Sequence, residues 1–231
     1  MKNFTRTTLK EALLLLFVAL VYTGCKKSGD PEIPSTVTDV DGNTYNVIVI
    51  GKQGWMKENL RVEHFNDGAV IPNITGATEW AALTSGAWCD YNNSTSNGTA
   101  YGKLYNGFAV ETGKLCPEGW RVPTSGDWTE LRDFLGGRNV AGGKIRQVGT
   151  SLWKAPNEGA TNSSEFTALP GGFRGPNGLY YMMSEIAMWW SSSTSAGKLP
   201  YWITSYTNLE LVENNPVPKT NGIAVRCIWE Q

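Results

Sequence analysis

Four cysteines and one histidine are the side chains in this sequence best suited to nucleophilic catalysis or to binding a transition metal. A Ser–His or Cys–His mechanism would depend on His64 alone, because the chain has no second histidine. The cysteines also lack the close pairwise spacing of zinc ligands. We therefore predict no catalytic residue, no bound metal and no cofactor, and we interpret His64 as a surface or packing residue.

The first of the cysteines, Cys25, stands where an exported protein is processed. Lys2, Arg6 and Lys10 precede an unbroken apolar run over residues 12–21, which is too short to span a bilayer but suits a signal peptide. Small residues then lead to Cys25, and the segment resembles the lipobox of bacterial lipoproteins. This resemblance implies that residues 1–24 are removed and that Cys25 carries the lipid anchor.

The residues after Cys25 bear on location. Lys26 stands where many Gram-negative lipoproteins kept in the inner membrane have Asp, so the resemblance favours the outer membrane, with the leaflet left open. Residues 25–38 are polar and contain proline, which predicts a flexible tether between the membrane and a domain over residues 39–231.

The composition of the domain excludes some partners. Residues 1–24 hold three of the 20 Lys and Arg residues and one of the 21 acids, which leaves the rest of the chain with a net charge of about −3. Nucleic-acid binding needs a basic patch, so we exclude it. Ten Trp, nine Tyr and 26 Gly favour short strands and tight turns over a helical bundle.

The pattern of residues predicts an α+β domain. The best-defined helix covers residues 124–135, where Thr124 is placed to cap the backbone and Trp128, Leu131, Phe134 and Leu135 are predicted to share one buried face before two glycines end the helix. A second short helix is predicted at residues 78–83, and residues 85–107 read as a long ordered loop. Strands are predicted at residues 44–50, 55–60, 166–169, 171–174, 187–191, 201–204 and 223–229.

Several blocks resemble the Fibrobacter succinogenes major paralogous domain, a family of secreted and lipid-anchored bacterial proteins. They run in order through nearly the whole domain, at residues 41–45, 55–60, 101–106, 116–124, 166–174, 189–192 and 225–227. Residues 121–128 are also similar to a signature of formylglycine-generating-enzyme-like domains. The resemblance implies a C-type-lectin-like fold of short irregular antiparallel strands with about two short helices, in which the first and last strands are adjacent.

The resemblance also bears on the three cysteines beyond Cys25. An exported domain sits in an oxidising compartment, where disulfides form. Cys116 and Cys227 lie in family-like blocks, so we predict that they pair and leave Cys89 as a buried free thiol. The competing pair is Cys89–Cys116. Formylglycine-generating enzymes use two cysteines near the end of the domain, and this chain offers only Cys227 there.

Sugar binding is the most specific positive hypothesis. Residues 213–216 and 189–192 do not match the motifs with which lectins of this fold bind sugar through calcium, so a calcium-dependent site is not expected. Aromatic rings can instead stack on sugars or anchor protein interfaces. The candidate ligand-binding residues are Tyr180, Tyr181, Trp202 and Tyr206, beside polar residues of the 91–99 segment. Arg174 and Arg226 are predicted to be structural.

We therefore expect a non-enzymatic cell-envelope lipoprotein that binds polysaccharide or an envelope protein at the surface. The alternatives are a structural or assembly component of the envelope and a divergent formylglycine-generating-type modifying enzyme.

Overall fold

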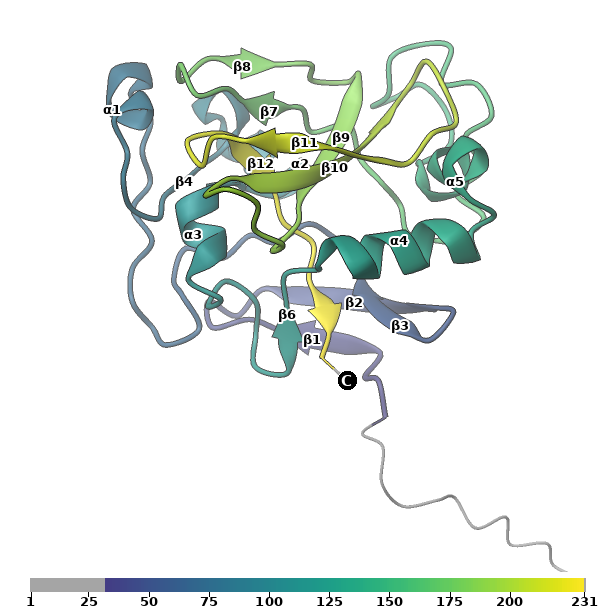
Figure 1. Cartoon of the computed structure of the whole chain (residues 1–231), viewed down its shortest axis with the longest axis horizontal. Coiled ribbons are helices and arrows are strands. Elements are labelled where there is room, and N and C mark those ends of the chain that lie inside the picture. Colours follow the sequence, from purple (N-terminus) through teal and green to yellow (C-terminus); the bar gives the residue numbers. More distant parts are fainter. Residues whose placement is uncertain (1–31, 231) are drawn as a thin grey trace, which may run out of the picture. The chain divides into compact units, whose positions relative to one another are not determined.

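The computed structural model describes residues 32–230, all within one unit of the chain (Figure 1). The predicted signal peptide and Cys25 lie outside the described residues. Within residues 32–230, no helix is long and apolar enough to cross a bilayer. The predicted tether reaches into the ordered unit, because Thr36–Thr38 forms the first strand, β1.

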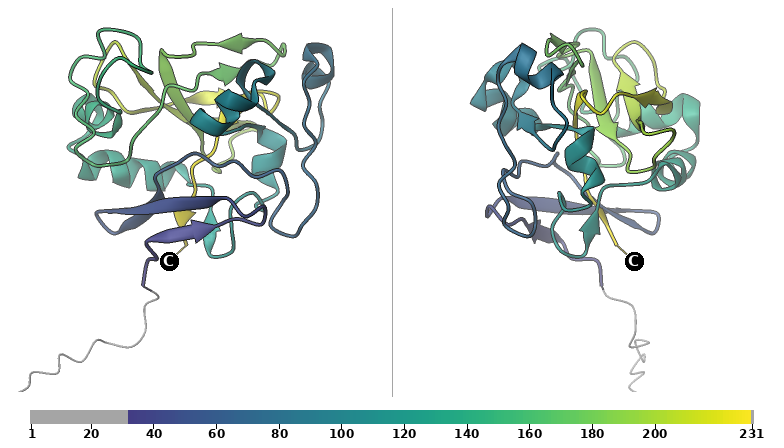
Figure 2. Two further views of the ribbon diagram at one scale, coloured as in Figure 1. Left: turned by 180° about the vertical axis from the view of Figure 1, so that it is seen from behind. Right: turned by 60° about the vertical axis from the view of Figure 1, so that its left-hand side comes forward.

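The smaller of two sheets joins the two ends of the described chain. Its order is β1-β2-β3-β13-β6. β2 covers Thr44–Ile50, as predicted, and β3 covers Gln53–Met56. The predicted return strand over residues 55–60 is therefore wrong beyond Met56. The last strands are β6 (Trp120–Arg121) and β13 (Ile228–Trp229). The first and last strands share this sheet, but the expectation that they are adjacent is wrong, because β3 lies between β2 and β13. The described chain begins and ends at the same end of the domain (Figures 1 and 2).

The larger sheet has the order β11-β10-β9-β12-β5-β4, and the β7–β8 hairpin is attached to it through β12. Its strands are β4 (Trp88–Cys89), β5 (Leu104–Asn106), β7 (Phe173–Arg174), β8 (Tyr180–Tyr181), β9 (Ile186–Trp190), β10 (Leu199–Ser205), β11 (Val212–Val217) and β12 (Gly222–Ala224). The predicted strands at residues 187–191 and 201–204 correspond to β9 and β10. The predicted strand at residues 166–169 is wrong, since only Ala168 makes an isolated bridge, to Arg146.

The predicted strand at residues 223–229 is broken into two strands that belong to different sheets. β12 lies in the larger sheet and β13 in the smaller one, and the yellow end of the chain passes from one to the other in Figure 1. Between them, the carbonyls of Val225 and Cys227 accept hydrogen bonds from the backbone of Leu60 and Met56. The alternation of apolar residues over 223–229 thus continues while the chain crosses from one sheet to the other. The alternation alone does not show where the first strand ends and the second begins.

Five short α-helices and one 3-10 turn are described. They are α1 (Ala77–Ala81), α2 (Thr95–Tyr101), α3 (Gly107–Glu111), α4 (Ser125–Phe134), α5 (Arg138–Ile145) and η1 (Tyr91–Asn93). α1 and α4 were predicted. The long loop over residues 85–107 is wrong, because this segment contains β4, η1, α2 and β5. The expected number of helices, about two, is also too low.

The helix α4 confirms the predicted cap and corrects its predicted face. Thr124 and Asp127 form a capping box, and Gly136 and Gly137 adopt the left-handed conformation after the helix. Phe134, however, is 63% exposed. Six residues after Trp128, it is rotated by about 240° around the axis and so leaves the buried face.

Aromatic side chains fill much of the core. Trp55, Trp128 and Trp189 surround Phe166, and Trp202 stacks on Trp128, with ring centroids 4.8 to 6.0 Å apart in the contacting pairs. Arg226 is fully buried beside them, with its guanidinium 4.2 Å from the centroid of the Phe166 ring. This packing confirms the structural role predicted for Arg226.

Candidate functional site

The four aromatic candidates do not form one binding surface. Trp202 is completely buried and stacks on Trp128, so its prediction as an exposed ligand-binding ring is wrong. Successive side chains of a strand point to opposite faces of the sheet, and on β10 Trp202 lies on the buried face between the half-buried Tyr201 and Ile203. Tyr206 lies near Lys154, whose ammonium is 5.4 Å from its ring centroid. The other two candidates lie on β8.

Tyr180 and Tyr181 have neighbours within the domain. The Tyr180 ring packs 5.1 Å from that of Tyr91. The Tyr180 hydroxyl donates to Asn93 Oδ1 at 2.7 Å, while Tyr181, 37% exposed, stacks on Phe173. None of the four candidates lines any of four cavities found among the described residues.

The largest of these cavities is an open cleft of about 700 Å³. Almost all of its lining is polar or charged: Asp41, Asn43, Arg61, Glu63, Asn73, Trp88, Asp90, Thr95, Gly98, Thr99 and Lys103. A second cavity of about 140 Å³, which reaches Tyr101 and Gly102, shares Arg61 and Thr99 with the first. The two cavities are therefore neighbours beside α2. We refer to the larger cavity as the α2 cleft.

The turn before β2 positions one wall of the α2 cleft. The Asp39 carboxylate accepts hydrogen bonds from the backbone of Asp41 and Asn43 and from the Tyr45 hydroxyl, the last at 2.6 Å. Burial and this carboxylate raise the pKa of Tyr45, so the phenol stays a donor. The loop is thereby fixed, and Asp41 is presented at the cleft.

Asp41 is the acceptor for His64. Its carboxylate accepts from the backbone N–H groups of Glu63 and His64 and contacts His64 Nδ1 at 2.5 Å. Partial burial raises the pKa of Asp41, but these hydrogen bonds outweigh it and hold the pKa below its ordinary value. His64 is therefore a partly exposed partner of a stable carboxylate at the rim, consistent with the surface role predicted for it.

A buried ion pair forms the floor of the α2 cleft. The Lys103 ammonium lies 3.0 Å from Glu63 Oε1, 3.7 Å from Asp90 Oδ1 and 3.4 Å from the centroid of the Trp88 ring. The lysine covers the ring face, so Trp88 is not a free stacking platform. Asp90 is only 5% exposed, and its burial raises the pKa of its carboxyl even though Lys103 acts in the opposite direction.

Gly98 lets α2 close over the floor. A Cβ at this position would overlap the carboxylate of Asp90. The helix approaches the acid because residue 98 has no side chain, and this approach leaves the side chains of Thr95 and Thr99 facing the cleft. No local pattern indicates this wall, which depends on the contact between Asp90, in the connection from β4 to η1, and Gly98 of α2.

The cysteines pair as predicted. Cys116 and Cys227 form a disulfide, and Cys89 is a buried free thiol whose pKa is raised by burial. The competing Cys89–Cys116 pair is wrong. Arg174, also predicted to be structural, is buried and donates to the carbonyls of Ile74, Thr75 and Gly178.

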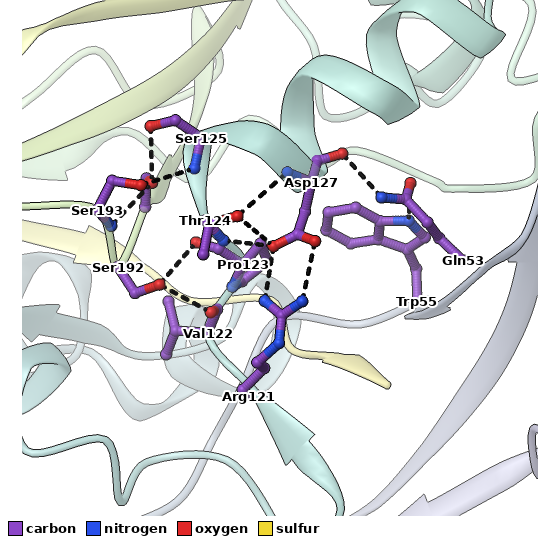
Figure 3. A network of polar contacts seen from close by, with 11 residues as sticks. Gln53, Trp55, Arg121, Val122, Pro123, Thr124, Ser125, Asp127, Ser192 and Ser193 are labelled. Carbon is purple, nitrogen blue, oxygen red and sulfur yellow. Dashed lines mark hydrogen bonds and ion pairs between the residues drawn. The ribbon is translucent and has the colours of Figure 1, made fainter. Parts of the chain in front are cut away.

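The block at residues 121–128 builds the start of α4. Figure 3 shows Asp127 between Arg121 and Thr124: both guanidinium nitrogens donate to its carboxylate, at 2.6 and 2.9 Å, and the Thr124 backbone donates to it as well. The Gln53 side chain donates to the Asp127 carbonyl. All of these contacts join parts of the fold to one another, so the conspicuous signature is structural.

Residues 213–216 border a separate cavity of about 330 Å³ together with Ser193, Thr194 and Ser195. Its lining contains one carboxylate, that of Glu213, which accepts a hydrogen bond from Ser125. Nowhere in residues 32–230 do three His, Cys, Asp or Glu side chains gather as a metal site.

The sequence matches the family described as Fibrobacter succinogenes major domain over residues 48–229. The matched range includes most of the α2 cleft lining and the α4 signature but begins after Asp41 and Asn43. No curated protein and no solved structure matches the chain.

Proposed function

The chain belongs to the Fibrobacter succinogenes major domain family, and we propose that it is a non-enzymatic lipoprotein of the bacterial cell envelope that binds polysaccharide or an envelope protein. Cys25 carries the anchor in this proposal, and the outer membrane is its location. Two or more acyl chains would hold the domain stably at the bilayer.

The α2 cleft is the observation that carries the binding role. Its volume of about 700 Å³ lies within the range of roughly 300–1,000 Å³ typical of ligand pockets. Amide, carboxylate, hydroxyl and guanidinium groups converge on it, which supplies both donors and acceptors. Aromatic stacking on Tyr180 and Tyr206 is not part of the proposal, since neither ring lines the cleft.

The state of the reactive groups supports a role without catalysis. A formylglycine-generating-type enzyme would need Cys227 as a reactive thiol, but this cysteine is oxidised in a disulfide and fully buried. Lys103 is engaged by two carboxylates, and Asp41 is stabilised in its ionised form by hydrogen bonds. These groups are suited to holding a ligand in place.

One surface favours the second candidate, an assembly component of the envelope. Leu179, Tyr181 and Met182 are 54%, 37% and 50% exposed around the β7–β8 hairpin. Neighbouring apolar side chains of this kind are typical of contacts between proteins. Stoichiometric co-purification of an envelope protein, lost on changing Leu179 and Met182 to Ser, would favour this candidate.

A pair of variants on one helix tests the binding role. Thr99 lines both cavities, so Thr99→Trp should fill the α2 cleft, whereas Ser96→Trp places the same ring on an exposed position of α2 outside it. The full-length protein in detergent is applied to insoluble cellulose, xylan, chitin and peptidoglycan and to outer-membrane extract. We expect retention of the wild type and of Ser96→Trp and loss with Thr99→Trp. Equal retention of both variants would contradict the proposal.

A further inference from the structure

Lys103 and Asp90 face each other across the last two strands of the larger sheet. The antiparallel register of β4 and β5 pairs Cys89 with Leu104. Continued by one position, this register places Asp90 opposite Lys103, and the Lys103 Nζ indeed lies 3.7 Å from Asp90 Oδ1. Facing residues on adjacent strands have Cβ atoms about 4.5–5.5 Å apart, so the backbone on both sides holds the amine beside the carboxyl group.

Both groups are shielded from water. The side chains of Lys103 and Asp90 are 10% and 6% exposed, and Nζ lies 3.4 Å from the centroid of the Trp88 ring. Gly98 covers the carboxylate so closely that a Cβ on this residue would overlap it. An amine taken out of water is a better nucleophile, and exclusion of water suppresses competing hydrolysis. Burial also raises the pKa of Asp90, which favours the uncharged carboxyl group that a nucleophile can attack.

Asp90 Oδ1 has no hydrogen-bond partner within residues 32–230. The amine at 3.7 Å is its ion-pair partner but lies too far away for a hydrogen bond. A buried polar atom without a hydrogen bond destabilises the folded state. Condensation of the carboxyl group with the lysine would remove this oxygen together with both buried charges.

Glu63 is placed to transfer the protons that such a condensation requires. Its Oε1 lies 3.0 Å from Lys103 Nζ, within hydrogen-bond distance, and its side chain is 55% exposed. A carboxylate in contact with the amine can take a proton from it and deliver a proton to the leaving oxygen. Nucleophile, electrophile and proton carrier therefore meet at one place in the fold.

We propose that Lys103 and Asp90 form an intramolecular isopeptide bond, with Glu63 as the proton carrier. Starting from ammonium and carboxylate, Glu63 moves one proton from Nζ to the Asp90 carboxylate. The lone pair of the resulting amine attacks Cγ, and one electron pair of the C=O bond moves to its oxygen. Glu63 then carries a second proton from Nζ to the hydroxyl group. As the C=O bond reforms, the Cγ–O bond breaks and one water leaves, so Glu63 is regenerated and no oxidant or other reactant is needed.

The bond would join β4 to β5 and close residues 90–103 into a covalent loop. This loop contains η1 and α2, so one wall of the α2 cleft would be fixed to the sheet. The inference is independent of the proposed binding function, because it concerns a bond within the domain.

Peptide mapping of the full-length protein, purified in detergent, tests the bond. The chain is reduced, fully denatured and digested with trypsin or with chymotrypsin. In the wild type we expect no tryptic cleavage after Lys103. Chymotrypsin can cut at Tyr91 and Tyr101, between the joined residues, so it should release a branched peptide lighter by one water than its two parts. Lys114, whose ion pair with Asp67 is short but exposed, is the internal control and should be cleaved normally.

Two variants assign the roles. Asp90→Ala lacks the carboxyl group and Glu63→Gln lacks the proton carrier, so we expect loss of the branched peptide in both. The matched control is Glu185→Gln, which removes a carboxylate from the Lys154 ion pair and should retain the bond.

The wild type alone decides whether the bond exists, whatever the stability of the variants. Complete tryptic cleavage after Lys103 in the denatured wild type would overturn the proposal. A loss of water without a branched peptide would also overturn it, since a succinimide has the same mass but leaves the two peptides separate. An undiminished yield of branched peptide in Glu63→Gln would overturn the role given to Glu63.

Discussion

Removal of the Cys116–Cys227 disulfide is the perturbation whose effect is best defined by the fold. The bond closes a loop of 111 residues. Cys227 lies between β12 of the larger sheet and β13 of the smaller one, and Cys116 lies between α3 and β6. Both cysteines are buried in one hydrophobic cluster that also contains Trp120 and Val225. The bond thus restrains the segment that connects β12 of the larger sheet to β13 of the smaller one.

The stability that the disulfide contributes can be estimated from the length of the loop that it closes. On the chain-entropy treatment, closing a loop of this size lowers the entropy of the unfolded chain enough to stabilise the folded state by about 5 kcal/mol at 25 °C. For a domain of this size, 1 kcal/mol corresponds to about 2–4 °C in melting temperature. The double change Cys116→Ala with Cys227→Ala should therefore lower the melting temperature by about 10–20 °C.

The assay is urea denaturation of the oxidised wild type, the double variant and Cys89→Ala, followed by tryptophan fluorescence. Cys89 is also buried but forms no disulfide, so its variant reports the cost of removing a buried sulfur without opening the loop. We expect the double variant to lose several times as much free energy of unfolding as Cys89→Ala. Similar losses in the two variants would refute the loop-closure reasoning.

Three further changes test the cap, the acid response and the anchor. Thr124→Ala removes the acceptor for the Asp127 backbone and should cost about 1 kcal/mol in urea denaturation. Burial raises the pKa of Asp127, but hydrogen bonds from Arg121 and Thr124 hold it below its ordinary 3.8. The stability from this ionised form is present above pH 3.8 and is lost as pH falls through the lowered pKa, so Asp127→Asn should be less stable at pH 7 and should respond less to acid between about pH 5 and about pH 2. Cys25→Ser should abolish palmitate labelling and move the protein from the detergent phase to the aqueous phase.

The first two of these changes have matched controls. Ser96→Ala, at an exposed position of α2, should leave the urea midpoint unchanged. Asp133→Asn is the control for the acid series, because its carboxylate is exposed and pairs only with the neighbouring Arg132 among the described residues. Palmitate labelling that persists in Cys25→Ser would contradict the assigned anchor, and an unaltered acid response in Asp127→Asn would contradict the role given to its hydrogen bonds.

The sequence alone determined the features that depend on neighbouring residues. The strand over residues 44–50 and the capped helix before Gly136 follow from local pattern, because backbone preference and capping act within a few positions. The family follows from ordered blocks of sequence, and the presence of Cys116 and Cys227 in two of these blocks allowed the correct pairing to be chosen. The class of fold, α+β, was likewise accessible.

Tertiary structure decided the rest, above all the proposed binding site. The α2 cleft takes its walls from the turn at Asp41, from Arg61 and Glu63, from Asp90 and from Lys103, which become neighbours only when the chain folds. Its shape also depends on Gly98, since a side chain there would collide with Asp90. Trp202 illustrates the converse: an aromatic residue carries no local sign of whether its ring faces solvent or core. Burial is set by long-range packing, and single-sequence patterns report only the period along the chain.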